Sequence, residues 1–153
     1  MTDTLETGAR SAEKRSVSSQ IFPGDKTAPR AATSWLRSLP TGLSESRLAD
    51  AELCLDELVT NIVRYAWSDG GAHTLTVSVE RAGGEVEIAV EDDGLAFDPT
   101  AAPLAPIPHT LDEAVPGGRG LLLVRSIAPK LRYERRGDVN RVAIAFPLDA
   151  SAP

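Results

Sequence analysis

Glu57 and Asn61 lie four residues apart in a segment rich in apolar residues. If that segment is helical, the two side chains lie one turn apart on the same face. A carboxylate can accept a proton from a reacting group, and an amide oxygen is a hard ligand that suits Mg²⁺. The pair therefore indicates a base and a cation ligand at one edge of a pocket. The alternative is the exposed polar face of an amphipathic helix.

A second candidate is the segment Asp92-Asp93-Gly94, which follows a run of alternating apolar residues. A carboxylate at a strand end can accept a hydrogen bond from the exocyclic amino group of adenine. A glycine beside it lets the backbone pass close to the base. Two acids before a glycine also simply mark a turn in many proteins. The segment is thus a candidate base-binding site, with a plain turn as the alternative.

The third candidate is the glycine-rich segment that contains Gly118, Arg119 and Gly120. Glycines directly before a helix expose unpaired amide groups at the positive helix end, and both attract phosphate. The segment is neither a Walker loop nor a GxGxxG fingerprint, because no Lys-Ser/Thr follows it and no strand precedes it. The alternative is a glycine hinge that binds nothing.

The clearest element that could position these groups is a helix over about residues 45–67. Ser44 is a suitable N-cap, and apolar residues recur at helical spacing from Leu48 to Ala66. A Ser-Asp-Gly-Gly sequence ends the pattern. Cys54, the only cysteine, falls within the apolar stripe, so we expect a buried side chain rather than a reactive thiol.

The remaining elements are predicted from periodicity and turn residues. Helices are expected over residues 26–39 and 119–129, and strands over 15–22, 74–80, 85–91, 131–136 and 139–146. The segment 98–118 carries five prolines, and long loops of this kind are usually functional. Because strands and helices do not alternate strictly, we expect a two-layer α/β sandwich, with a mixed, mostly antiparallel sheet and helices on one face.

Composition narrows the function class. The chain has 153 residues, 42% of them hydrophobic and 25% charged, which is typical of a soluble globular protein. We expect one domain over residues 15–148, with tails at 1–14 and 149–153. A net charge of −6 disfavours direct nucleic-acid binding. No apolar run approaches the roughly 20 residues of a membrane span, and the first residues do not resemble a signal peptide. We therefore expect a cytoplasmic protein without membrane contact.

The three motifs in this order resemble the N, G1 and G2 boxes of GHKL (Bergerat-fold) ATPases. The amino-acid sequence of residues 55–67, 92–99 and 118–121 is similar to that of the switch-protein serine kinases that act as anti-sigma factors, the RsbW and SpoIIAB group. The resemblance covers about residues 17–148. It implies a histidine-kinase-like ATPase domain that binds ATP or ADP together with Mg²⁺.

The resemblance also implies roles for the two polar motifs. Glu57 would be the general base that takes the proton from a substrate serine, and Asn61 would be the ligand of Mg²⁺. Asp92 would recognise adenine, and Gly94 would give the base room.

For the third motif, the resemblance implies contacts with the phosphates. Gly118 and Gly120 would place backbone amides on them, and Arg119 could add positive charge. The proline-rich stretch up to Gly117 would be the ATP lid.

The implied function is that of an anti-sigma factor and serine-protein kinase. It would phosphorylate a STAS-type anti-anti-sigma protein on serine and sequester a sigma factor. A homodimer is expected through the first strand and helix, with residues 17–22 and Trp35 as contacts. The alternative is a non-catalytic module of the same fold that binds ATP or a partner. A sensor histidine kinase fits less well, since neither His73 nor His109 lies on a plausible dimerisation helix.

Two positions depart from the family pattern. Tyr65 stands where the family often has histidine, and we expect it to serve in packing. Ala143 is the best match to a family threonine near the adenine. Loss of that hydroxyl would remove one hydrogen bond and weaken nucleotide binding by about 1 kcal/mol.

Overall fold

Five strands and three helices make up the described part of the chain, residues 15–101 and 118–149 of the computed structural model. The predicted N-terminal tail, most of the predicted lid and residues 150–153 lie outside it. In chain order the elements are β1 (Ser16–Pro23), α1 (Ala28–Ser38), α2 (Glu45–Tyr65), β2 (Thr74–Ala82), β3 (Glu85–Asp92), α3 (Gly118–Ile127), β4 (Lys130–Arg136) and β5 (Val139–Pro147).

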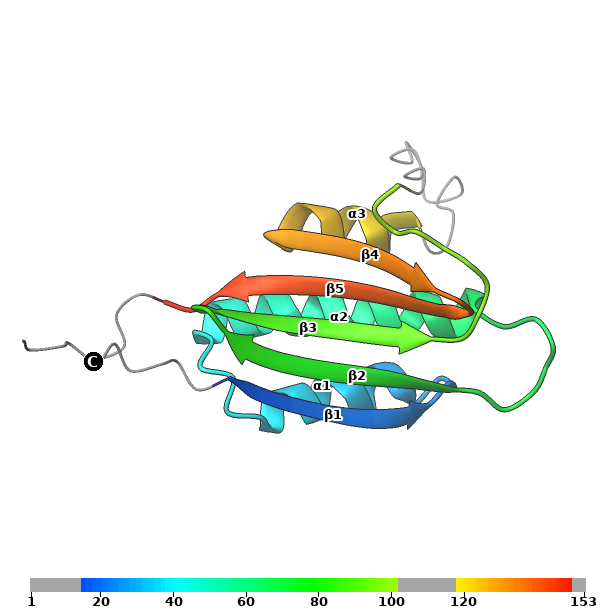
Figure 1. Cartoon of the computed structure of the whole chain (residues 1–153), viewed down its shortest axis with the longest axis horizontal. Coiled ribbons are helices and arrows are strands. Elements are labelled where there is room, and N and C mark those ends of the chain that lie inside the picture. The colour runs from blue at the N-terminus through cyan, green and yellow to red at the C-terminus, as the bar shows by residue number, and fades with distance from the viewer. Residues whose placement is uncertain (1–14, 102–117, 150–153) are drawn as a thin grey trace, which may run out of the picture.

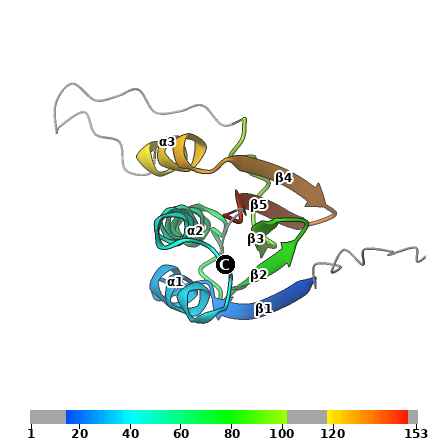
Figure 2. The same cartoon turned by 90° about the vertical axis from the view of Figure 1, so that its left-hand side faces the viewer.

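The strands form one sheet in the order β1-β2-β3-β5-β4 (Figure 1). Figure 2 shows that the three helices all lie on one face of this sheet. The predicted two-layer sandwich is therefore confirmed. The prediction of a mixed sheet is wrong for the described strands, because every pairing among them is antiparallel. Two hairpins, β2–β3 and β4–β5, account for two of these pairings, and β5 runs antiparallel to β3 beside it.

The core lies between the helices and the inner face of the sheet. Its strand residues alternate along the central strands and pack against the apolar stripe of α2. Cys54 belongs to this stripe and is completely buried. Burial raises the pKa of its thiol to about 11, so it is a structural side chain, as predicted.

The α2 helix begins as its sequence predicts, because the Ser44 side chain accepts a hydrogen bond from the amide of Arg47. Its other end is joined to the turn that follows β3. The amide of Leu95 donates to the carbonyl of Ala66 at 2.9 Å. This bond places the last turns of α2 directly beside the end of β3, and so brings two of the three sequence motifs together.

The outer face of the sheet carries ion pairs instead of helices. Glu87 on β3 contacts Arg132 of β4 at 2.5 Å and Arg141 of β5 at 2.7 Å. Between these charged residues lie Ala89 and Ala143, which are paired across β3 and β5 and are buried. None of the described helices is long and apolar enough to cross a membrane.

Candidate functional site

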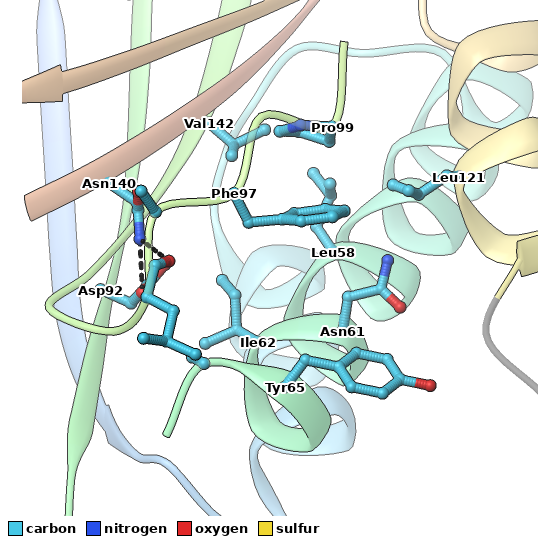
Figure 3. A pocket seen from close by; sticks show the side chains of 13 residues that line it. Leu58, Asn61, Ile62, Tyr65, Asp92, Phe97, Pro99, Leu121, Asn140 and Val142 are labelled. Atoms are coloured by element: carbon cyan, nitrogen blue, oxygen red, sulfur yellow. Dashed lines mark hydrogen bonds between the residues drawn. The ribbon is translucent and has the colours of Figure 1, made fainter. Parts of the chain in front are cut away.

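A cavity of about 440 Å³ lies between α2, the turn after β3, the first turns of α3 and the start of β5 (Figure 3). Its size is typical of a small-molecule site. It is lined by Leu58, Asn61, Ile62, Tyr65, Ala66, Asp92, Leu95, Ala96, Phe97, Pro99, Leu121, Asn140 and Val142. Most of these side chains are apolar, so the few polar ones determine what the cavity can recognise.

Two of the predicted site residues share this cavity. Asn61 extends from α2 near Leu121 of α3, whereas Asp92 lies at the opposite side beside Asn140 (Figure 3). The cavity thus has a carboxylate at one end and an amide at the other, with apolar walls between them. This arrangement suits a flat base that carries phosphates at one end.

Asp92 is buried and hydrogen-bonded within the cavity. It is 6% exposed, and its Oδ1 accepts hydrogen bonds from the amide of Gly94 at 2.9 Å and from Nδ2 of Asn140 at 3.0 Å. Both of these bonds use the same oxygen. The other oxygen, Oδ2, is used by neither, and a ligand donor could bind to it.

Asn140 is a site residue that the sequence analysis missed. It is 3% exposed and lies at the start of β5. The signal was present, because Asn140 falls in the same alternating phase as Val142 and Ile144, which face the helices. A polar residue at a core-facing position of an otherwise apolar strand indicates a buried hydrogen-bonding role.

The expectation for Ala143 is wrong. Val142 lines the cavity, and successive side chains of a strand point to opposite faces. Ala143 therefore lies on the outer face, opposite Ala89 and Arg132 on the neighbouring strands. No hydrogen bond to a base is lost there, because the polar residue that β5 contributes to the cavity is Asn140.

Glu57 lies outside the walls of the cavity but next to the start of α3. A Cβ atom added at Gly120 would overlap Oε2 of Glu57, so the third motif lies against the first. Burial raises the pKa of the Glu57 carboxyl, and the charge of Asp56 raises it further, while Arg64 partly opposes the shift. A base with a raised pKa, one turn from Asn61, is suited to accept a proton.

The comparison with known families agrees with this geometry. Residues 22–146 match the histidine kinase-like ATPase domain. The chain belongs to this family. The resemblance inferred from the three motifs is therefore confirmed at the level of the ATPase family.

Two relatives of this ATPase domain carry kinase names. The serine/threonine-protein kinase BtrW of Bordetella bronchiseptica is 37% identical over 92 residues, which cover 60% of this chain and 65% of BtrW. The serine-protein kinase RsbW of Bacillus subtilis is 28% identical over 103 residues, which cover 65% of this chain and 64% of RsbW. The chain thus spans just under two thirds of the length of each relative.

A solved structure shares the fold of this ATPase domain. The RsbU and RsbW domains of Rv1364c from Mycobacterium tuberculosis superpose with a TM-score of 0.64 at 18% identity. The match covers 90% of this chain and 34% of that one. At this identity the likeness extends to the fold alone.

Within this ATPase domain, Gly94 has a steric role that the sequence did not reveal. A Cβ atom added there would come within 2.5 Å of the Cβ and the carbonyl oxygen of Ala66. Any side chain would therefore push the turn away from the end of α2. The glycine is required where the turn meets the helix, whether or not it also gives a base room.

Tyr65 also differs from its predicted packing role. It is 55% exposed, lines the cavity and directs its ring outward beside Asn61 (Figure 3). Gly118 begins α3, as predicted for the third motif. The side chain of Arg119 lies outside what the structure describes, so its contact with phosphate stays a prediction.

Proposed function

We propose that this chain is a serine-protein kinase that binds Mg²⁺-ATP in the cavity and phosphorylates a STAS-type anti-anti-sigma protein. The same chain would also sequester a sigma factor. The observation that carries the proposal is the position of Glu57. Its carboxyl has a raised pKa and lies against Gly120 at the start of α3, one turn from Asn61. A module that only binds a nucleotide has no use for a base there.

The residues present suit an adenine nucleotide. Asp92 offers an acceptor at one end, apolar side chains such as Ile62 and Phe97 can cover both faces of a base, and Asn61 can bind a cation at the other end. When bound, ATP would supply the phosphoryl group and Mg²⁺ would neutralise the charge that develops during transfer. The protein positions the groups that react.

Glu57 would act as the general base of the phosphoryl transfer. Its carboxylate would accept the proton of the partner's serine hydroxyl as the hydroxyl oxygen bonds to the terminal phosphorus of ATP. The bond from that phosphorus to the bridging oxygen would break, and ADP would leave. Only the ionised form of Glu57 can accept the proton. The burial that raises its pKa also makes the carboxylate a stronger base.

The direct test uses the full chain, a STAS-type candidate partner, ATP and Mg²⁺. Intact-mass measurement of both proteins should show the partner heavier by one phosphoryl group, with the kinase unchanged. Peptide mapping should place that group on serine. Nucleotide binding without any transfer would instead favour the non-catalytic module. Absence of nucleotide binding would overturn both functions.

Replacement of Gly120 by alanine should lower transfer without unfolding the protein. The added methyl group would occupy the position of the Glu57 carboxylate, which must rotate away because it is the flexible partner. Alanine is also the better helix former, by about 1 kcal/mol. We expect an unchanged or higher melting temperature and a loss of transfer. Equal transfer by both proteins would contradict the placement of Glu57.

A homodimer through the β1 edge belongs to the same proposal. Residues 16–23 of β1 contain no charged side chain, and Val17 and Ile21 are 59% and 66% exposed. The opposite edge, β4, is strongly charged, which discourages strand pairing. Trp35 packs on β1 from the helix layer, because its ring meets that of Phe22 edge-on with the ring centroids 5.9 Å apart. Light scattering at micromolar concentration should give twice the mass of one chain; a monomer would contradict this arrangement.

A further inference from the structure

We propose that Asn140, held by Tyr133 and Arg135 of β4, is a positioning residue that makes Asp92 select a base with an exocyclic amino group. The inference rests on the proposed nucleotide-binding function and deepens it, because it assigns the selectivity for the base to a network that extends beyond the cavity. The network consists of five hydrogen bonds around the buried amide of Asn140, the longest of them from Nδ2 to the carbonyl oxygen of Gly94 at 3.4 Å.

The orientation of the Asn140 amide is fixed from both sides. Its Nδ2 donates to Oδ1 of Asp92 at 3.0 Å and to the carbonyl oxygen of Leu95 at 2.8 Å. Its Oδ1 accepts from the hydroxyl of Tyr133 at 2.5 Å and from the guanidinium of Arg135 at 2.9 Å. A flipped amide would place its oxygen against two acceptors and its nitrogen against a cation.

Burial makes this orientation costly to abandon. Asn140 is 3% exposed and Asp92 is 6% exposed, so neither can exchange its partner for bulk water. Arg135 adds a second restraint, since the same guanidinium nitrogen donates to the carbonyl oxygen of Gly94 at 3.1 Å. The strand β4 thereby fixes the turn that carries Asp92.

The consequence for the ligand follows from which oxygen of Asp92 is used. Asn140 and the amide of Gly94 both donate to Oδ1, which leaves Oδ2 to face a ligand as an acceptor. The 6-amino group of adenine donates a hydrogen bond to such an oxygen. The 6-oxo group of hypoxanthine or guanine would place an oxygen against it, without a proton between them.

The test measures binding rather than transfer. Calorimetric titration of the full chain with Mg²⁺-ATP and with Mg²⁺-ITP gives the ratio of the two affinities. A general loss of structure would weaken the binding of both nucleotides and leave this ratio unchanged. For the unaltered protein we expect ATP to bind at least about tenfold more tightly than ITP. In Asn140→Leu, which keeps the size but removes the amide, the ratio should fall to within about twofold.

Two further variants complete the design. Arg135→Gln removes the cation that holds Oδ1 of Asn140, so the ratio should fall part of the way. Arg132→Gln is the matched control on the same strand, since Arg132 lies on the outer face and binds Glu87 instead. The control should keep the ratio of the unaltered protein. Circular dichroism and a melting curve establish that each variant is folded.

The outcomes separate the two claims. If Asn140→Leu is folded and keeps the full preference for ATP, the positioning role of Asn140 is overturned and the proposed function stands. If Asn140→Leu does not fold, Arg135→Gln decides, and an unchanged ratio in it overturns the inference. If the unaltered protein binds neither nucleotide, the proposed function fails first.

Discussion

Replacing Glu57 with glutamine should slow phosphoryl transfer to the partner by about 10²- to 10⁴-fold, the usual contribution of a general base. Glutamine keeps the size of the side chain and its place beside Gly120 but cannot accept the serine proton. Mg²⁺-ATP affinity should change by less than about twofold, because Glu57 is not part of the cavity wall. Single-turnover transfer and calorimetric titration measure the two quantities separately.

The pH dependence gives a second measure of the same residue. Transfer should rise with pH as Glu57 loses its proton, and fall as pH drops through its pKa. Since burial and Asp56 raise that pKa, the acidic limb should lie at a higher pH than for an ordinary glutamate. Glu45→Gln, at the exposed start of α2, is the matched control and should keep the limb. A full rate in Glu57→Gln would overturn the assignment of the base.

Replacing Asp92 with asparagine should weaken Mg²⁺-ATP binding by about 10- to 100-fold, the effect of losing a buried charged hydrogen bond. If the new amide oxygen keeps the bonds from Gly94 and Asn140, its nitrogen must face the base. Two donors then meet, and the amino group of adenine loses its acceptor. Calorimetric titration measures the change, and a melting curve checks that the variant is folded.

The adjacent acid provides the control for Asp92. Asp93 is exposed, and its Oδ1 accepts from the indole of Trp67 at 2.8 Å. Asparagine at position 93 can keep that bond, so Asp93→Asn should bind ATP as the unaltered chain does. If the two variants lose the same affinity, the effect is one of net charge rather than of a specific contact with the base.

The sequence predicted the elements well where a single period dominates. One face is buried in α2, whose apolar stripe runs from Leu48 to Ala66, and in the alternating strands β2 and β3. A single buried face determines both the type of the element and its position in the sequence. The same reasoning placed Glu57 and Asn61 on one face of one helix. The Gly-Gly turn between β2 and β3 was also readable, since Gly83 and Gly84 both adopt positive φ.

Contacts between distant segments could not be read in the same way. Asn140 lies 48 residues from Asp92, and only the register between β3 and β5 brings them opposite each other. Ala143 was chosen by its match to a family threonine, and only the strand register shows that it lies on the outer face of β5. The role of Tyr65 depends on where α2 ends relative to the cavity, which is set by tertiary contacts beyond the helical period.

The buried thiol described in the core has a practical consequence for spectroscopy. Cys54 is the only cysteine, is fully buried and has a pKa of about 11, so alkylating dyes will react with it slowly at neutral pH. A cysteine introduced at an exposed site such as Leu95, at the rim of the cavity, can then carry a fluorophore alone. Nucleotide occupancy becomes measurable by optical titration without removing the native sulfur.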